Sequence, residues 1–451
     1  MYDLKNTIVA LCTPKGIGSI AVIRLSGSES WDIAKKIFEG EVPEPRFHHM
    51  HAQHGFIKDG DKTIDEVIIL PYKSPNSFTT EDVIEIFCHG GIKVPSMILD
   101  LCLKNGAKSA RAGEFTFRAF INGRIDLTEA EAINEIVNSS SEKAAYGATE
   151  NITGALKQKV NLFREKLFNL ITMLEGAIEF PLDVESRGEV TPPLLSIKKE
   201  IDELIKSSKE GHILRDGARV SIIGLPNAGK SSLLNQMLEV NRAIVTEIPG
   251  TTRDTIEEKI ILDGWPIVLI DTAGIREHKY ADVPEKYGIE RTKTTIKNSD
   301  IVLFIKDLTY KEKNGASQQI LDWIADKPKV IVGNKVDLLT QEPDDCDIAV
   351  SARYGTNLEK LKTEIILKIQ EMHSVSKPVN QTTFVNERQK ELLLEANSSI
   401  EEALSMTLRK LPDDLLADEL KKAISKLDEV TGKIVNEDVI KNIFSKFCIG
   451  K

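Results

Sequence analysis

The sequence predicts a multidomain protein that combines α/β and all-helical parts, and three observations lead to this prediction. Residues 1–119 are rich in short apolar runs that stop at Gly, Pro or Ser, which is typical of the strands of an α+β domain. Residues 120–213 and 374–451 show the periodicity of amphipathic helices. Residues 214–373 alternate strand and helix signals, which predicts a parallel sheet. The α/β unit is therefore expected to be inserted into a helical domain.

The composition is that of an ordinary globular chain. It has 451 residues, of which 41% are hydrophobic and 28% are charged. The formal net charge of −10 means that the surface as a whole does not attract nucleic acid, so any RNA contact needs a local basic patch or a partner's surface. Five scattered cysteines, the lack of a signal peptide and the lack of an 18-residue apolar run predict a cytoplasmic protein with no membrane segment.

The N-terminal and helical segments have distinct signals. Strands are expected at TIVALCTP, SIAVIRLSG, EVIILPY and DVIEIFCHGG, and a helix at PSMILDLCLKNGA, closed by Gly106. A long helix before Pro181 carries one apolar stripe: Leu156, Val160, Phe163, Leu167, Leu170, Leu174 and Ile178. Further helices are expected at TPPLLSIKKEIDELIKSSKEG, NERQKELLLEANSSIEEAL and LADELKKAISKLDEVTG.

In the α/β unit, strands are expected at ARVSIIG, DIVLFIKD, KVIVGNKVD and DIAVSAR, and a hairpin around Asp263-Gly264 in EKIILDGWPIVLID. GLPNAGKSS, after the first of these strands, fits the pattern of a phosphate-binding loop. Its backbone N–H groups would wrap phosphates, Lys230 would meet the β- and γ-phosphates, and the Ser231 hydroxyl would bind Mg²⁺.

Four more motifs follow in the order that a GTPase requires. GTTRD supplies Thr252 as a second Mg²⁺ ligand, and DTAG places Asp271 near the metal. NKVD supplies Asp337, whose carboxylate can accept two hydrogen bonds from guanine, and SAR supplies backbone N–H groups for the guanine oxygen. The expected GTP-binding residues are Asn227, Ala228, Gly229, Lys230, Ser231, Ser232, Thr246, Glu247, Ile248, Pro249, Gly250, Thr251, Thr252, Asp271, Thr272, Ala273, Gly274, Asn334, Lys335, Asp337, Ser351, Ala352 and Arg353.

Two details concern the hydrolysis mechanism. Ile275 follows DTAG, where many GTPases carry a water-orienting glutamine, and an apolar side chain cannot orient water. The acidic candidates for that role downstream are Glu277, Asp282, Glu285 and Glu290. Asn227 carries a side-chain oxygen inside the phosphate-binding loop and is a candidate ligand of a monovalent cation, although it also suits a turn.

These motifs, together with GIERT, RAGEFTFRAFINGRIDLTEAEAI and the terminal FCIGK, resemble the MnmE (TrmE) family of tRNA modification GTPases over essentially the whole chain. The resemblance implies an N-terminal domain that binds a tetrahydrofolate derivative (5-formyl- or methylene-tetrahydrofolate) and forms a homodimer, a helical domain and a Ras-like P-loop G domain. It also implies K⁺-stimulated GTP hydrolysis and an FAD-containing MnmG-type partner. The two proteins would add an aminomethyl or carboxymethylaminomethyl group to C5 of the wobble uridine of certain tRNAs, using a methylene-tetrahydrofolate one-carbon unit.

Matching positions carry over the family's roles. The resemblance implies Asn227, Thr246, Ile248 and Thr251 as K⁺ ligands, Ser231 and Thr252 as Mg²⁺ ligands, and Glu285 as the residue that orients the attacking water. It implies Arg24, Glu81, Arg124 and Lys451 as folate-binding residues. Arg124 stands where lysine is common, and the change alters hydrogen-bond geometry while keeping the charge.

Cys448 stands three residues before Lys451, in a segment that has three interpretations. CIGK makes a poor prenylation box, because Gly450 and Lys451 occupy the wrong positions. Gly450 suits a helix C-cap. The resemblance favours a third interpretation, in which the Cys448 thiol acts as a proton donor or nucleophile in the modification. The alternative function for the whole chain is a ribosome-assembly or translation-associated GTPase switch without modification chemistry.

Overall fold

The computed structural model describes residues 4–40, 48–179, 187–241, 257–270, 285–310, 315–340, 343, 345–373 and 383–451. The chain divides into two compact units. The first unit comprises Met1–Asn134, Ile152–Val190 and Ser398–Lys451, and the second comprises Glu135–Asn151 and Thr191–Asn397. Among the described residues, each unit contains one β-sheet.

The sheet of the first unit has the order β3-β4-β5-β6-β2-β1-β7. Its strands are β1 (Ile8–Leu11), β2 (Ile20–Ser26), β3 (Phe38–Gly40), β4 (Gln53–Asp59), β5 (Lys62–Tyr72), β6 (Val83–His89) and β7 (Lys108–Ser109). The pairs are antiparallel except for β1 and β7. The four predicted strand segments are all strands.

The two faces of this sheet differ. One face packs on α1 (Ser30–Ile37) and α2 (Lys93–Lys104) through fully buried side chains that include Ile23 and Ile86. Because side chains alternate along a strand, the neighbours Arg24 and Glu85 lie on the opposite face, directly across from each other in the register of β2 and β6. The predicted helix before Gly106 is α2.

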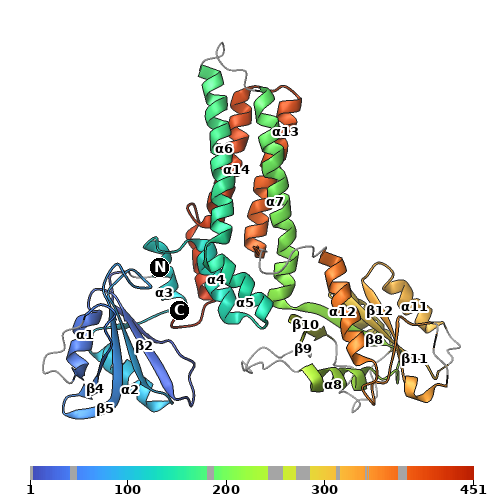
Figure 1. Ribbon diagram of the computed structural model, residues 1–451, viewed down its shortest axis with the longest axis horizontal. Helices are drawn as coiled ribbons and strands as arrows, with labels where there is room; N and C mark the ends of the chain where they lie inside the picture. The colour runs from blue at the N-terminus through green and yellow to red at the C-terminus, as the bar shows by residue number, and fades with distance from the viewer. Residues whose placement is uncertain are drawn as a thin grey trace. The chain divides into compact units, whose positions relative to one another are not determined.

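Helices complete the first unit: α3 (Glu114–Ile121), the first part of α4 (Leu127–Asn138), α6 (Ala155–Glu179), α14 (Asp413–Thr431) and α15 (Glu437–Ser445). Helix α6 lies along α14 (Figure 1), and the Arg164 Nε donates to Asp428 Oδ1 at 2.8 Å between them. Six of the seven predicted stripe residues are buried, but Ile178 is 47% exposed, so its assignment was wrong. Ala177 is buried instead, because a steady alternation of four- and three-residue steps leads from Leu174 to position 177.

Two helices differ from the predicted limits. Helix α7 (Arg187–Asp216) begins four residues before the predicted TPPLL start and contains Pro192 and Pro193. These prolines lack the N–H that the helix would use, so the second turn forms with fewer hydrogen bonds. Helix α7 also crosses the predicted boundary at 213/214, as α3 crosses the one at 119/120. Helix α13 (Glu387–Leu408) starts at a reciprocal cap, in which Asn386 and Gln389 each donate a backbone N–H to the other's side-chain oxygen at 3.0 Å.

The sheet of the second unit has the order β13-β12-β11-β8-β10-β9. Its strands are β8 (Ala218–Gly224), β9 (Glu258–Leu262), β10 (Trp265–Ile270), β11 (Ile301–Asp307), β12 (Lys329–Asn334) and β13 (Ile348–Val350). All neighbours are parallel except β9 and β10. The predicted β9–β10 hairpin is confirmed, and its turn has two positive φ angles, 45° at Asp263 and 79° at Gly264.

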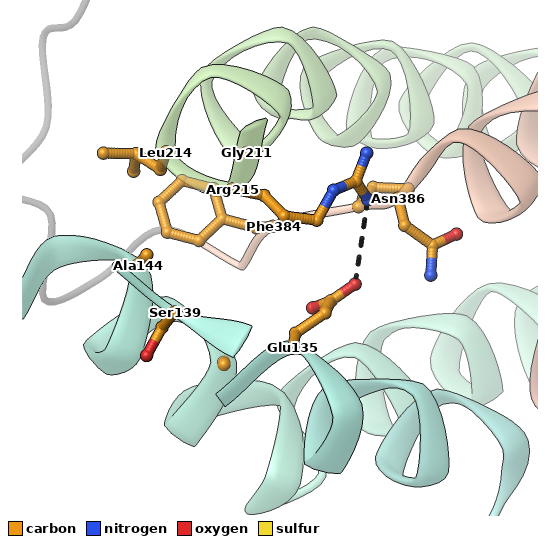
Figure 2. Close-up of a pocket in the computed structure, with 10 residues that line it drawn as sticks. Glu135, Ser139, Ala144, Gly211, Leu214, Arg215, Phe384 and Asn386 are labelled. Carbon is orange, nitrogen blue, oxygen red and sulfur yellow. Dashed lines mark ion pairs between the residues drawn. The ribbon is translucent and has the colours of Figure 1, made fainter. Parts of the chain in front are cut away.

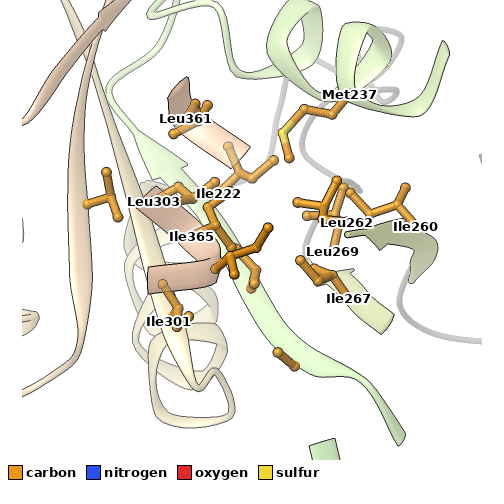
Figure 3. Packing of buried hydrophobic residues seen from close by; sticks show 14 of the residues in the cluster. Ile222, Met237, Ile260, Leu262, Ile267, Leu269, Ile301, Leu303, Leu361 and Ile365 are labelled. Carbon is orange, nitrogen blue, oxygen red and sulfur yellow. The ribbon is translucent and has the colours of Figure 1, made fainter. Parts of the chain in front are cut away.

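Helices cover both faces of this sheet, as a parallel sheet requires. On one face, α8 (Lys230–Asn241) and α12 (Leu358–His373) bury side chains such as Met237 and Leu361 against Ile222 and Leu303 (Figure 3). On the other face, α10 (Glu285–Lys297) and α11 (Ala316–Trp323) pack on the alternate residues of the same strands. Among the helices that the structure describes, none combines the length and apolar character that a membrane crossing requires.

A small pocket lies where α7 leads into β8 (Figure 2). Phe384 packs against Gly147 of α5 (Glu142–Ile152) and Gly211 of α7. A Cβ added at Gly147 would lie 2.0 Å from the Phe384 ring, and one added at Gly211 would lie 3.0 Å from the Phe384 Cβ. The Arg215 guanidinium approaches the Glu135 carboxylate at 4.0 Å. This packing fixes the end of α7 from which the β8 strand starts.

Candidate functional site

The loop between β8 and α8 has the geometry of a phosphate-binding loop. It follows the carboxyl end of β8, the strand where the chain turns from one half of the parallel sheet to the other, which is where ligands bind in such sheets. Asn227 has a φ of 63° and Gly229 a φ of 90°, so the backbone turns sharply before α8. The Lys230 ammonium donates to the Gly224 and Leu225 carbonyls at 2.9 Å each. Lys230 is also the first residue of α8, so the partial positive charge of the helix N-terminus and the lysine ammonium together favour an anion here.

Asn334 ties the second predicted motif to this loop. Its side-chain Nδ2 donates to the Ala228 carbonyl at 2.8 Å, and its Oδ1 accepts from the Ala352 N–H at 3.0 Å. A Cβ at position 229 would lie 2.0 Å from Asn334 Nδ2, so only glycine fits between the loop and this amide. One buried side chain therefore joins three segments that were predicted to bind one nucleotide.

The NKVD segment continues as a tight turn. Lys335 has a φ of 70° and pairs with Asp307, and Asp337 lies in the 3₁₀-helix η1 (Val336–Leu338). Burial acts to raise the pKa of Asp307, but hydrogen bonds from Lys335 and Thr309 outweigh it and hold that pKa below its usual value. The ion pair between Lys335 and Asp307 holds the turn that presents Asp337.

The SAR segment closes the site. The Ser351 N–H donates to the Thr356 carbonyl at 3.3 Å, and Ala352 is buried. Arg353 stacks on Tyr354, with its guanidinium carbon 5.4 Å from the ring centroid. Residues 227–232, 334–337 and 351–353 thus lie at the carboxyl ends of β8, β12 and β13, which are parallel strands of one sheet.

Several predicted site residues lie outside the part of the chain that the structure describes. They are the residues from Thr246 to Thr252, those from Asp271 to Gly274, and Ile275, Glu277 and Asp282. Glu285 is the first residue of α10, and only its backbone is described. Within the described parts of the chain, no group of three or more His, Cys, Asp or Glu side chains is placed to hold a metal ion.

The second candidate site lies on the face of the N-terminal sheet opposite α1 and α2. Arg24 pairs with Glu85 at 2.8 Å, and its guanidinium lies 5.6 Å from the ring centroids of both Phe78 and Phe115. Arg124 stacks on the same Phe78 ring at 4.9 Å and donates to the Phe78 carbonyl at 3.0 Å. The structure therefore gathers two of the predicted folate-binding residues around one aromatic side chain.

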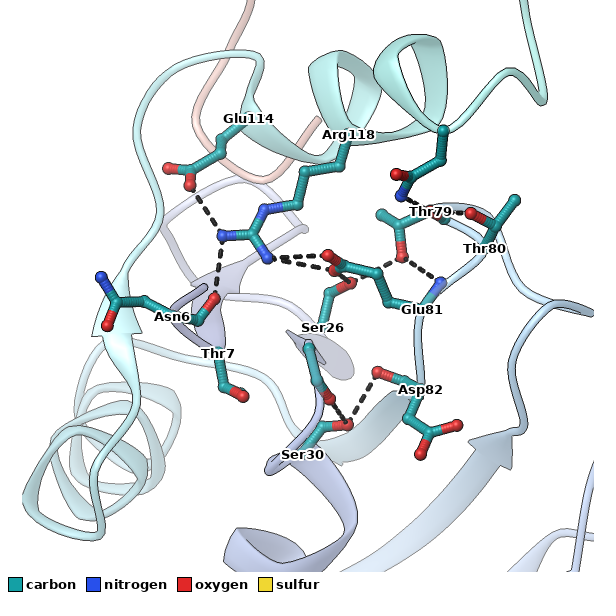
Figure 4. Close-up of polar contacts among 12 residues, drawn as sticks. Asn6, Thr7, Ser26, Ser30, Thr79, Thr80, Glu81, Asp82, Glu114 and Arg118 are labelled. Carbon is teal, nitrogen blue, oxygen red and sulfur yellow. Dashed lines mark hydrogen bonds and ion pairs between the residues drawn. The ribbon is translucent and has the colours of Figure 1, made fainter. Parts of the chain in front are cut away.

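Glu81 lies apart, in a network centred on Arg118, which has no exposed surface (Figure 4). Arg118 Nη1 donates to both Glu81 oxygens at 3.0 and 3.1 Å, and Nη2 donates to Glu114 at 3.0 Å and to the Asn6 carbonyl at 2.9 Å. Ser26 also donates to Glu81 at 2.6 Å. The Glu81 carboxylate is thus held by hydrogen bonds from within the protein.

The C-terminal segment binds along the start of α3. Ala112 and Ile449 form an antiparallel bridge, and the Phe115 N–H donates to the Lys451 carbonyl at 3.1 Å. A Cβ on Gly450 would lie 2.6 Å from the Leu11 carbonyl oxygen, so this residue must be glycine for the tail to dock. Helix α15 ends at Ser445 with Lys446 as its C-cap, so the interpretation of Gly450 as a helix cap was wrong. Cys448 is exposed.

Cys12, Tyr72, Phe78 and Glu85 surround Arg24 as well, although none of them had been predicted as a site residue. Burial raises the pKa of Cys12, while Arg24 and Lys451 act to lower it and Glu85 acts to raise it, so these groups share one neighbourhood. Burial also raises the pKa of Tyr72, which hydrogen-bonds to Glu85. These residues carry no local motif, and only the pairing of strands far apart in sequence brings them together.

The other two N-terminal cysteines have no part in this group. Burial raises the pKa of Cys88 to about 11 and that of Cys102 to about 12, so both thiols stay protonated near neutral pH. Both side chains are buried in the core between the sheet and α2.

Comparison with known proteins adds to this geometry. Residues 7–124 match a family described as "GTP-binding protein TrmE N-terminus", and residues 127–448 match the "MnmE helical domain". The tRNA modification GTPases MnmE of Thermotoga maritima and Acetivibrio thermocellus are each 39% identical to this chain, over 99% and 100% of it and all of each relative. The protein of that name from Lactobacillus gasseri is 38% identical, over 99% of this chain and 98% of its own length. The chain belongs to the MnmE family of tRNA modification GTPases.

Proposed function

We propose that this protein hydrolyses GTP as part of tRNA modification. The observation that supports this most directly is the Asn334 side chain, which joins the phosphate-binding loop, the NKVD turn and the SAR segment through two hydrogen bonds. Its 39%-identical relatives are named tRNA modification GTPases over their full length. In this proposal, Lys230 meets the phosphates and Asp337 meets guanine.

The proposed metal ions have these ligands. Ser231, in the first turn of α8, would hold Mg²⁺ with Thr252, and the ion would neutralise charge on the β- and γ-phosphates. Asn227, whose exposed side chain leaves the loop from a left-handed backbone, would bind K⁺ with Thr246, Ile248 and Thr251. Glu285, at the start of α10, would orient the attacking water.

The finer part of the proposal concerns the N-terminal site. We propose that Arg24, Arg124 and Lys451, together with Glu81, bind a tetrahydrofolate derivative, and the stacked arginines around Phe78 support a site for a flat, anionic ligand. The protein would act in the cytoplasm as a homodimer with an FAD-containing MnmG-type partner. Together they would add an aminomethyl or carboxymethylaminomethyl group to C5 of the wobble uridine of certain tRNAs. Cys448, on the exposed tail, would serve as the proton donor or nucleophile.

The test of this function is mass spectrometry of wobble uridines from cells that lack the protein and from cells complemented with variants. We expect the modified uridines to disappear and to return with the wild-type gene. The Cys448→Ser variant should keep GTPase activity without restoring modification. If wobble uridines stay fully modified without the protein, the proposed function is wrong, and a ribosome-assembly or translation-associated switch becomes the better hypothesis.

The proposed ion and water roles have a separate test. GTP hydrolysis should be faster in K⁺ than in Na⁺ at equal ionic strength, and Glu285→Ala should abolish hydrolysis while leaving the Kd for GTP within about threefold. Equal rates in both salts would remove the cation from the mechanism. A large loss of GTP affinity in Glu285→Ala would instead mark Glu285 as a structural residue.

A further inference from the structure

The chain is acidic overall, yet two segments far apart in sequence are basic. Residues 101–124 carry five Lys or Arg side chains and one acidic side chain, and residues 439–451 carry three Lys and none. The whole chain has 59 basic and 69 acidic residues, so these segments reverse its general balance. Neither segment is basic enough alone to stand out as a nucleic-acid-binding patch.

The fold joins the two segments into one surface. The Ala112–Ile449 bridge and the hydrogen bonds from Gly113 N–H to Cys448 O (3.4 Å) and from Phe115 N–H to Lys451 O (3.1 Å) align the tail with residues 112–115. Phe444 and Phe447 pack beneath it, within 3.1 Å of where a Gly113 Cβ would lie. In Figure 1 the end of the chain lies beside α3.

Some cations of these segments already have acidic partners. Arg118 is buried between Glu81 and Glu114. Lys104 pairs with Asp59 at 3.5 Å, and Lys441 pairs with Asp438 at 3.3 Å. These three cations contribute little to the field outside the protein, because an opposite charge lies next to each.

The remaining cations differ in this respect. Lys108, Arg124, Lys446 and Lys451 form no ion pair with any acidic group in the described parts of the chain. Lys108, Arg124 and Lys446 are exposed. We call Lys108, Arg124, Lys446 and Lys451 the tail surface. Arg124 and Lys451 also belong to the proposed folate site, so Lys108 and Lys446 are the charges of this surface that can meet another anionic partner.

We propose that the tail surface binds the sugar-phosphate backbone of a folded RNA, and this inference rests on the proposed function in tRNA modification. Lysine and arginine side chains supply most of the affinity for nucleic acids by neutralising phosphates and releasing counterions. The exposed large apolar side chains of the two segments are Ile121 on α3, Val439 on α15 and Ile449 on the tail, each on a different element. A protein partner would need a larger apolar centre, whereas a phosphate backbone needs only spaced cations.

The tail surface also lies next to the proposed folate site. Lys451 belongs to the neighbourhood of Arg24 and Cys12, and Lys446 lies on the other side of the exposed Cys448. An RNA held by phosphates on both sides of the tail would therefore lie over the face that carries the proposed one-carbon site. Contacts of this kind position an RNA without reading its bases.

The experiment uses the full chain and a fluorescein-labelled anticodon stem-loop RNA, with binding followed by anisotropy over a range of KCl concentrations. The test variant is Lys108→Glu/Lys446→Glu. The matched control is Lys36→Glu/Lys62→Glu, which makes the same change of charge at two exposed lysines of α1 and β5. Hydrogen exchange of the β1 and β2 amides and GTPase activity together verify that both units of every variant are folded.

We expect the test variant to bind RNA at least tenfold more weakly than wild type at 100 mM KCl, and the control to stay within about threefold. The log–log salt slope should fall by about 0.7 to 0.9 for each phosphate that the variant no longer neutralises. The Lys108→Arg/Lys446→Arg variant should bind as wild type does. Equal affinity of test and control variants, or no RNA binding by wild type, would overturn the proposal.

A further outcome separates an RNA partner from a protein partner. If the test variant keeps its RNA affinity but no longer restores wobble modification in cells, the tail surface takes an acidic protein and the RNA proposal is wrong. Failure of the proposed function is distinct, because it would show as normal wobble uridines in cells without the protein, whatever the anisotropy shows.

Discussion

The two β-sheets of this molecule build their sites in different ways. In the second unit the site consists of loops at the ends of parallel strands, shaped by glycines, backbone carbonyls and one bridging amide from Asn334. In the first unit it consists of side chains on a sheet face, where Arg24, Glu85 and Arg124 converge from strands and loops far apart in sequence. The first kind of site depends on backbone shape and the second on side-chain partners.

This difference explains why the nucleotide site could be predicted from the sequence and the surroundings of the N-terminal site could not. A backbone loop needs particular residues at fixed spacing, so GLPNAGKSS and NKVD identify their own positions, and the hairpin at Asp263-Gly264 identifies its turn. The class and order of the elements followed from periodicity in the same way. Ion pairs and side-chain contacts between strands that are far apart in sequence follow no fixed spacing, so the sequence does not reveal them.

The largest expected effect tests the dependence of the N-terminal sheet on side chains. Arg118→Met removes a buried cation and leaves the Glu81 and Glu114 carboxylates without their partner. We expect the first unit to lose about 3 to 5 kcal/mol of stability. Hydrogen exchange of the β2 and β6 amides, followed by mass spectrometry, measures this loss within the unit.

Arg124→Met is the control for that experiment, because Arg124 is exposed and stacks on Phe78 without an acidic partner in the described parts of the chain. It should cost about 1 kcal/mol or less. Similar losses in the two variants would mean that the Arg118 network is not what holds the sheet.

The second effect tests the dependence of the nucleotide site on backbone shape. Gly229→Ala places a Cβ 2.0 Å from Asn334 Nδ2 on a backbone with a φ of 90°. We expect GTP affinity to fall on the order of 100-fold, about 2.7 kcal/mol, as measured by calorimetry. Gly176→Ala is the control, since nothing lies within 4 Å of its added Cβ. Normal GTP binding by Gly229→Ala would contradict the described loop.

The third effect asks whether one side chain sets base specificity in a site otherwise made by backbone. Asp337→Asn should weaken GTP binding by roughly 10- to 100-fold, because the carboxylate that accepts hydrogen bonds from guanine is replaced by a neutral amide. Binding of xanthosine triphosphate should improve, since the Asn amide can donate to the xanthine oxygen. Competition assays with both nucleotides measure the change, and unchanged selectivity would reject the assignment of Asp337.

The smallest effect concerns the ion pair between Asp307 and Lys335 at the NKVD turn. Asp307→Asn should cost about 1 kcal/mol or less, because the Lys335 partner is partly exposed. Since the pKa of Asp307 is lowered in the folded protein, its contribution to stability is complete above the unfolded pKa of about 4 and is lost as the pH falls through the folded value. Urea midpoints of wild type and variant should therefore differ at pH 7 and converge in acid. A constant difference at all pH values would exclude the ion pair as the cause.

Three features of the structure could not be predicted from the sequence. A helix was expected to begin at Thr191, yet α7 begins at Arg187 and includes Pro192 and Pro193. Its later turns are held by packing of Ile197 and Ile201, both fully buried. Glu81 matched a ligand position, and the structure surrounds its carboxylate with Arg118 and Ser26. The tail surface escaped notice because its two halves are separated by more than three hundred residues.

The division of the chain into units has a consequence for the order of assembly during synthesis. The continuous part of the second unit, Thr191–Asn397, leaves the ribosome before Ser398–Lys451, which the first unit needs. Until Phe444 and Phe447 arrive, the apolar side chains of Phe117 and Leu127 lack part of their core. The domain translated first is therefore the last to be completed, and until then part of its apolar surface remains in contact with water.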